Sequence, residues 1–225
     1  MPQLPPQTLL APRVARSRDD LDVSAGPEEV RWESCEAHGD LTGAELVDLD
    51  IAESLVRSVT FTGAHVERFR ATDTIFESCE LSGALLEGAA LTRVEFRSCR
   101  MRGFSAPACR LRDVRLVDCQ LDDANLRMCR GERVGFESTS MRGADLYEAE
   151  LSGAHLFDCD LSGAELSKIR MAAARLHGCT LDEIKGAGYL RDVVIDPTQL
   201  VPLALNVFAA LGITIDDERD PSASA

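Results

Sequence analysis

The feature that most constrains this chain is an apolar residue at every fifth position from Leu41 to Leu181. Of these 29 positions, 26 are Leu, Ile, Val, Met or Phe. A second series, two residues earlier and running from Gly39 to Cys179, is mostly Ala, Cys or Val. Neither series contains a charged residue, although 28% of the chain is charged, so both series are predicted to be buried.

A period of five fits neither the helical repeat of 3.6 nor the simple strand repeat of two. It fits a backbone that turns a corner every five residues and points two side chains inward from each side. A second period fixes the number of sides, because Cys79, Cys99 and Cys119 follow one another at steps of 20 residues, as do Cys159 and Cys179. We therefore predict four sides per coil, with coils stacked about 4.8 Å apart.

Several five-residue units point to a known family. Gly-Ala-Glu-Leu at 43–46 and 163–166, and Gly-Ala-Asp-Leu at 143–146, resemble the A(D/N)LXX repeat of the pentapeptide-repeat family. The resemblance covers about residues 30–196 and implies an all-β fold, the right-handed quadrilateral β-helix. Within the family, the chain is similar to the MfpA and Qnr quinolone-resistance types. The MfpA type is the closer comparison, because the unbroken repeat leaves no room for the loops of the Qnr type.

The sequence divides into four predicted regions. Residues 1–29 are expected to be a disordered tail, 30–195 the solenoid, 196–215 a C-terminal helix and cap, and 216–225 an acidic tail. Val30, Trp32, Cys35 and Ala37 repeat the inward pattern one residue out of phase with Leu41, which predicts a slip near residues 37–39 after an imperfect first coil.

Two details of the repeat carry further expectations. Glycine is predicted at corners of the coil, where a residue without a Cβ adopts the required backbone most easily. At Cys129 and Gly131 a small inward side chain is followed by a glycine, which has no side chain. A thin spot or a local bulge is therefore predicted there.

The C-terminal segment has the pattern of a helix. Asp196, Pro197 and Gln199 resemble an N-cap, a first-turn proline and a capping-box partner, and Gly212 is a good stop. The helix either only caps the last coil or also forms a homodimer, and the family resemblance agrees with the dimer. The residues assigned to dimerisation are Leu203, Val207, Phe208 and Leu211.

Composition narrows the function. A net charge of −14 disfavours nucleic acid and an anionic membrane as direct ligands and favours a basic protein partner. No apolar run has the length of a signal peptide or of a membrane span, so reduced thiols and a cytoplasmic location are expected. The cysteines follow the buried series and are interpreted as small apolar residues, and the four histidines are scattered. We therefore expect no metal, no cofactor and no catalytic site.

The predicted sides differ in charge over residues 39–183. Each side is named after its first large apolar residue. The Leu41 and Leu46 sides each carry seven acids and three bases, whereas the Ile51 side is at +1 and the Val56 side at −1. One hypothesis is DNA mimicry, in which the two acidic sides bind DNA gyrase or a related type II topoisomerase, as the family resemblance implies. The candidate contacts are Asp40, Glu45, Asp48, Glu80, Asp145, Glu148, Asp160 and Glu165.

The alternative hypothesis is an interaction scaffold for another protein partner. On the Ile51 side, Arg70, Arg110, Arg130 and Arg170 occupy equivalent outward positions and would suit an acidic protein. Acidic residues interrupt this stripe, and a merely solvated face is the favoured interpretation of it.

Overall fold

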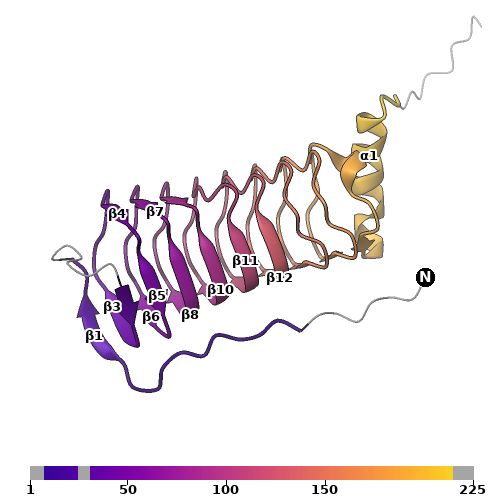
Figure 1. The fold of residues 1–225 in the computed structure, drawn as a ribbon. Helices are drawn as coiled ribbons and strands as arrows, with labels where there is room; N and C mark the ends of the chain where they lie inside the picture. Colours follow the sequence, from indigo (N-terminus) through magenta and orange to yellow (C-terminus); the bar gives the residue numbers. More distant parts are fainter. Residues whose placement is uncertain (1–7, 25–30, 215–225) are drawn as a thin grey trace, which may run out of the picture.

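The chain forms a straight four-sided rod. The computed structural model of the protein describes residues 8–24 and 31–214. Over these residues the backbone winds into a solenoid of about nine turns with one α-helix at its C-terminal end (Figure 1). Every strand pair described is parallel, as coils of one continuous helix require. The predicted β-solenoid with a C-terminal helical cap is confirmed.

The strands are short because each side of a coil is only five residues long. They are β1 Asp19–Asp22, β2 Arg31–Glu33, β3 Cys35–His38, β4 Glu45–Val47, β5 Asp50–Ala52, β6 Leu55–Arg57, β7 His65–Glu67, β8 Arg70–Glu77, β9 Leu85–Glu87, β10 Ala90–Arg97, β11 Arg110–Val117, β12 Arg130–Glu137, β13 His155–Phe157, β14 Arg175–His177 and β15 Val194–Ile195. Short 3₁₀ turns at Ala187–Tyr189 and Pro197–Gln199 precede α1, Leu200–Ala210.

Between the middle coils the register is the predicted 20 residues, whereas at the two ends the coils pair at 19, as Trp32 with Ile51 and Arg175 with Val194 show. In β8, β10 and β11, Phe76 pairs with Phe96 and Phe96 with Leu116. These strands and β12 are longer than the others because each continues from the Ile51 side round a corner onto the Val56 side. Asp73 in β8 and Asp113 in β11 lie at that corner.

Each corner holds one residue with left-handed backbone. Gly43 takes this conformation, as the repeat predicts, with φ of 65°. Most other corners have side chains there, for example Ser58 with φ of 53° and Asp73 with φ of 52°. The bond from the Ser58 N–H to the Glu77 carbonyl of the next coil, 2.9 Å long, shows what holds such a corner. Glycine is thus used at corners but is not required at each of them.

The core is a column of stacked, buried side chains. Cys79, Cys99 and Cys119 are each buried, and all eight cysteines are free thiols. The Cys99 and Cys119 thiols lie within hydrogen-bonding distance of the carbonyls of Phe76 and Phe96 (3.5 and 3.6 Å). The inward, stacked placement of the cysteines that the 20-residue period predicts is confirmed.

The predicted slip of the first coil lies at Gly39. Trp32 pairs with Ile51, 19 residues on, whereas Asp40 bridges to Thr60, 20 residues on. Gly39 sits between them with φ of 126°, and a Cβ on it would lie 2.5 Å from the Ser24 hydroxyl oxygen. The glycine therefore allows the change from a 19-residue to a 20-residue spacing between coils at this point.

The predicted thin spot at Gly131 is wrong. A Cβ on Gly131 would lie 2.7 Å from methyl groups of both Leu151 and Val134, so these neighbours already fill the space. β12 runs unbroken through the position, and Gly131 keeps its register with Leu111. Larger side chains on the adjoining side and the next coil compensate for the missing one.

The N-terminal segment differs from the disordered tail expected for 1–29. β1 pairs with β3, and residues 8–18 run along the outside of the solenoid from its middle coils toward its N-terminal end (Figure 1). We call residues 8–18 the N-terminal strap. It has no apolar period because it is not part of a coil, so the repeat pattern gives no sign of it. Residues 1–7 and 25–29 of that expectation, Val30 of the inward pattern and the acidic tail 216–225 lie outside the described residues.

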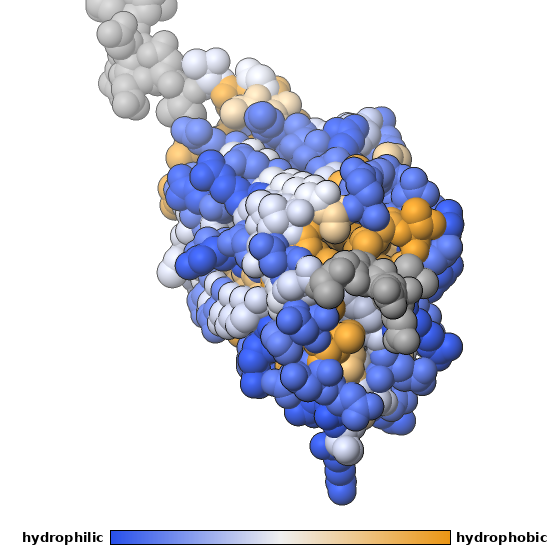
Figure 2. Space-filling view, turned by 90° about the vertical axis from the view of Figure 1, so that its left-hand side faces the viewer, coloured by the Kyte–Doolittle hydropathy of each residue, from blue (hydrophilic) through white to orange (hydrophobic). Residues whose placement is uncertain are grey.

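Two ends of the rod need covering, since a terminal coil leaves core side chains without neighbours. At the C-terminal end, Leu203 and Val207 of α1 pack against the core, and the Asn206 amide donates a 2.8 Å hydrogen bond to the Leu181 carbonyl. The predicted capping box of Asp196 and Gln199 is present at the turn that leads into α1. At the N-terminal end, hydrophobic residues gather in the view along the axis, and hydrophilic ones surround them (Figure 2).

Candidate functional surfaces

The solenoid walls stack the predicted acidic residues into columns. On the Leu41 side, Asp40 bridges to Thr60 and Thr60 to Glu80, each one coil further along. On the Leu46 side, Asp145 bridges directly to Glu165. Outward positions 20 residues apart are therefore nearest neighbours, separated by about 4.8 Å. Two like charges in this relation repel, and two opposite charges attract.

Most of the predicted acidic contacts have a cationic neighbour on an adjacent coil. Asp48 forms a two-pronged pair with Arg68, with both distances 2.6 Å, and Glu148 accepts from the Lys168 ammonium at 2.8 Å. The other pairs are Glu45 with His65 (3.1 Å, charged only when the histidine is protonated), Glu80 with Arg100 (4.0 Å), Asp145 with Arg127 (2.9 Å) and Asp160 with Arg142 (3.0 Å). Among the described residues, only Asp40 and Glu165 of the eight have no ion-pair partner.

These pairs change the electrostatics of the acidic sides. The hydrogen bond from Arg68 holds the pKa of Asp48 below its ordinary value, and that from Lys168 does the same for Glu148. Both carboxylates are thus ionised, but the neighbouring cation compensates part of their negative charge. The two sides keep an acidic excess, whereas the charge that a partner meets is smaller than a count of carboxylates implies.

An aromatic residue joins one of these clusters on the Leu46 side. Tyr147 lies between the guanidinium of Arg127 (4.4 Å from the ring centre) and the ammonium of Lys168 (4.9 Å). The same two cations pair with Asp145 and Glu148. This cluster was not predicted, and its signal in the sequence is the juxtaposition of residues about 20 apart, visible only once the coil length is known.

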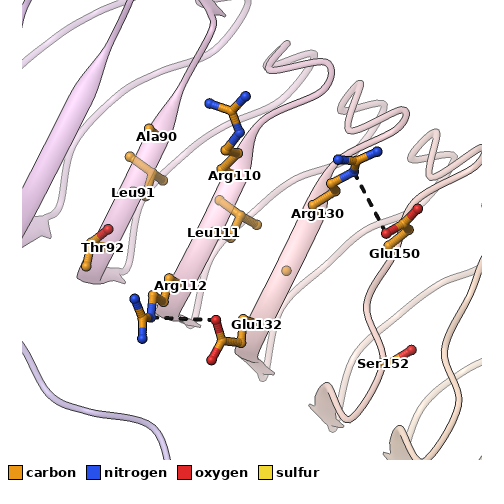
Figure 3. Close-up of a pocket in the computed structure, with 11 residues that line it drawn as sticks. Ala90, Leu91, Thr92, Arg110, Leu111, Arg112, Arg130, Glu132, Glu150 and Ser152 are labelled. Carbon is orange, nitrogen blue, oxygen red and sulfur yellow. Dashed lines mark ion pairs between the residues drawn. The ribbon is translucent and has the colours of Figure 1, made fainter.

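The Ile51 side carries a shallow pocket of about 590 Å³ (Figure 3). Arg110, Arg112 and Arg130 line it, together with Ala90, Leu111 and Gly131. Arg112 pairs with Glu132 at 3.6 Å and Arg130 with Glu150 at 3.8 Å, as the dashed lines in Figure 3 mark. Among the described residues Arg110 has no ion-pair partner, so this side keeps one uncompensated guanidinium.

The residues assigned to dimerisation divide between two faces of α1. Leu203 and Val207 pack against the solenoid core, so they cap the last coil. Phe208 and Leu211 face away from it and are 39% and 66% exposed. Further apolar residues extend the exposed surface of the helix region: Leu200, Val201, Leu205 and Ile213. An apolar surface therefore remains after the cap is made.

The described residues include His, Cys, Asp and Glu side chains, the groups from which a metal site or a reactive cysteine is built. Within 8–24 and 31–214, no cluster of three or more His, Cys, Asp or Glu has the geometry of a metal site. Hydrogen bonding to Cys129 and burial raise the pKa of the Cys109 thiol, so it stays protonated. No helix of the described residues is long and apolar enough to cross a membrane.

Three solved structures of other proteins resemble this one. QnrB1, described as a plasmid-mediated fluoroquinolone resistance protein, is 20% identical over 88% of this chain and 100% of its own, with a TM-score of 0.39. HetL of the cyanobacterium Nostoc, described as involved in heterocyst differentiation regulation, is 16% identical over 81% and 87%, with a TM-score of 0.32. Rfr23 of the cyanobacterium Cyanothece is 17% identical over 75% and 93%, with a TM-score of 0.22.

The sequence also matches two sequence models of one family. "Pentapeptide repeat region" matches residues 89–166, and "Pentapeptide repeats (8 copies)" matches 72–105 and 149–185. Together these matches span residues 72–185, just over half of the 225 residues. No curated protein matches the chain. With the five-residue period, the 20-residue coil and these matches in agreement, the chain belongs to the pentapeptide-repeat family.

Proposed function

We propose that this protein is a non-catalytic binding protein whose two acidic sides dock into a basic groove of a protein partner. The observation that carries the proposal is the acidic excess on two adjacent sides of a straight rod, seven acids against three bases on each. A rigid rod presents such a surface without the entropy cost of ordering it on binding. We further propose that the groove is one that otherwise holds duplex DNA, and that DNA gyrase or a related type II topoisomerase is the partner.

Charge density limits how closely the rod imitates DNA. Duplex DNA carries one charge per about 1.7 Å, so about 38 Å of it carries about 22 charges. The eight coils from Leu41 have about that length, yet their two acidic sides carry 14 acids against six bases. Docking would therefore depend on the shape of the rod more than on counterion release, and we expect its affinity to fall less steeply with salt than that of DNA.

A supercoiling assay with DNA gyrase tests the proposal, and charge reversal at unpaired acids makes it specific. Asp40→Lys with Glu165→Lys changes the acidic sides without breaking an ion pair of the described residues. We expect the wild type to change the gyrase activity or its quinolone sensitivity at micromolar concentration, and this variant to need at least about tenfold more protein.

The matched control has the same change of net charge on another side. Asp50→Lys with Glu53→Lys lies on and beside the Ile51 side, where neither carboxylate has an ion-pair partner among the described residues. This variant should act like the wild type. Equal losses in both variants would reject a side-specific contact, and no effect of the wild type on gyrase, with or without quinolone, would reject the topoisomerase as partner.

A second candidate is a scaffold for a different, acidic partner. The pocket on the Ile51 side favours it, because Arg110, Arg112 and Arg130 line a concave surface that a DNA mimic does not need. Under this alternative, reversal of Arg110 and Arg130 to glutamate would abolish partner binding, while Asp40→Lys with Glu165→Lys would leave it intact. The two candidates thus predict opposite results for Asp40→Lys with Glu165→Lys. This variant should weaken partner binding under the first candidate and leave it intact under the second.

We also propose that the protein is a homodimer through α1. Burial of the exposed apolar face of the helix would remove Phe208 and Leu211 from water. Sedimentation of a Phe208→Asp variant is expected to give the monomer mass where the wild type gives twice that value. Phe157→Asp, which places the same charge on the solenoid wall, should keep the wild-type mass. An unchanged mass of the Phe208 variant would count against the dimer.

A further inference from the structure

The N-terminal strap is held to one corner of the solenoid by its backbone. The N–H of Leu10 donates to Asp113 Oδ1 (3.0 Å), and the N–H of Arg13 donates to Asp73 Oδ1 (3.0 Å). Next to these, the N–H of Ala15 donates to the carbonyl of Glu53 (2.9 Å). All three acceptors belong to corner residues with left-handed backbone, at the edge between the Ile51 and Val56 sides.

Each of the two aspartates is held in place by one arginine of the solenoid. Asp113 accepts from Arg133 Nε (2.6 Å) and Nη2 (2.8 Å), and Asp73 accepts from Arg93 Nε (2.7 Å) and Nη2 (2.6 Å). In each case the arginine comes from the corner of the next coil. The carboxylate side chains are only 1% and 10% exposed. A buried carboxylate that accepts two hydrogen bonds from one guanidinium is held in a fixed orientation. Each of the two carboxylates can still accept a further hydrogen bond from a peptide N–H.

The spacing of these acceptors matches an extended peptide. Asp73 and Asp113 are two coils apart, which is about 9.6 Å along the axis, and three residues of extended chain span about 9.6 to 10.2 Å. Leu10 and Arg13 are three positions apart, so each anchoring N–H reaches its own carboxylate without strain. The corner column can therefore bind the backbone of any extended segment that lies along the rod.

The strap is separable from the wall that it covers. None of residues 8–18 is buried. A cavity of about 220 Å³ lies between Leu9–Pro12 and a wall that includes Val94, Glu95 and Arg115. Close-packed contact is thus absent along part of the strap. Three backbone bonds hold it, whereas a strand such as β11 is bonded along its whole length on both sides.

Charge distinguishes the strap from the rest of the molecule. Residues 8–18 contain three arginines and no acid, in a chain of net charge −14. The corner and wall near them carry carboxylates: Glu36, Glu53, Asp73, Glu95, Asp113 and Glu137. Arg18 of the strap reaches Glu36 at 3.6 Å. All of these carboxylates except Glu53 also pair with an arginine of the solenoid, so among the described residues the groove keeps one uncompensated carboxylate, Glu53, beside a basic occupant.

We propose that this corner groove is a binding site for an extended, basic peptide segment of a partner protein, and that the N-terminal strap is its intramolecular occupant. The ligand would donate a backbone N–H to Asp113 and, three residues on, another to Asp73. An apolar side chain would lie against Gly135, where the two methyl groups of Leu9 lie 3.8 and 3.9 Å from the position that a Cβ would occupy. The site lies away from the acidic Leu41 and Leu46 sides, so it stands independently of the topoisomerase proposal.

Removal of the two anchoring N–H groups tests this in the full chain. Proline has no N–H, so Leu10→Pro with Arg13→Pro deletes both bonds and changes no residue of the solenoid. Ala11→Pro is the matched control, since the Ala11 N–H makes no described hydrogen bond. The probe is a labelled synthetic peptide of residues 8–18, and its binding is measured by fluorescence anisotropy.

We expect the double variant to bind the probe at least about tenfold more tightly than the wild type or Ala11→Pro, because the intramolecular competitor is released. A probe with its three arginines changed to glutamate should not bind. In the wild type, the Ala15 amide should exchange with solvent orders of magnitude faster than the amides of β11.

Three results would overturn the proposal. The first is absence of probe binding by a double variant that melts at the wild-type temperature. The second is unfolding of the double variant, which would make the strap an integral part of the fold. The third is equal protection of the Ala15 amide and the β11 amides in the wild type. None of these results bears on gyrase, so the two proposals fail separately.

Discussion

Replacement of Phe96 by alanine is expected to lower the free energy of unfolding by about 3–5 kcal/mol. Phe96 is buried, and its ring stacks on that of Phe76 with centres 4.7 Å apart and planes 11° apart. The four walls are bonded to one another coil by coil, so they have little freedom to collapse into the space that the ring leaves. The loss therefore includes the cavity as well as the transfer of the ring to water.

Urea unfolding measures this effect, with Phe157→Ala as control. Phe157 is an outward residue of β13 that contacts His155 and His177. The same substitution there leaves the column of core side chains complete, so the midpoint should shift much less. Similar shifts for the two variants would mean that the stacked rings contribute nothing beyond what a surface phenylalanine does. A broadened or biphasic transition of Phe96→Ala would indicate that the two halves of the rod unfold separately.

Asp113→Ala is expected to cost about 2–3 kcal/mol at neutral pH. The substitution removes both bonds to Arg133 and the anchor of Leu10. The side chain of Asp113 is 1% exposed, but that of Arg133 is 17% exposed and reaches water in part, which limits the loss. Asp48→Ala is the matched control. Its pair with Arg68 has the same two-pronged geometry, but both side chains are about half exposed, so only a small change is expected.

The effect of Asp113 should depend on pH with a definite sign. The hydrogen bond from Arg133 holds the pKa of Asp113 below its ordinary value in the folded protein. A depressed pKa stabilises the folded state above the unfolded-state pKa, and this contribution is lost as the pH falls through the folded-state pKa. The difference between wild type and Asp113→Asn should be full at pH 7 and shrink only below the ordinary aspartate range. A difference that already disappears near pH 6 would contradict this origin.

The inner wall of the rod was predictable from sequence because burial acts on every inward side chain in the same way. Leu81, Cys99 and Phe136 could be placed without coordinates, since no charged residue interrupts their series. The slip at Gly39 was visible for the same reason, as a change of phase in that series.

The outer surface was less predictable because its partners are set by the register and not by a period. Asp48 and Arg68 each fit a solvated corner when considered alone, and only their separation of one coil makes them a pair. The strap escaped prediction for a stronger reason. Its anchors are N–H groups, which nearly every residue type supplies, so Leu10 and Arg13 give no sign of Asp113 and Asp73.

The strap and the solenoid advance along the axis in unequal steps, which restricts how this rod can lengthen. Duplication of one 20-residue coil extends the wall by about 4.8 Å, and the strap would need about one and a half further residues to keep pace. No whole number of residues matches a single added coil between Asp73 and Asp113, whereas three match two coils. Duplication of coils between Asp73 and Asp113 would therefore keep both aspartates in step with an extended strap only if it added coils in pairs.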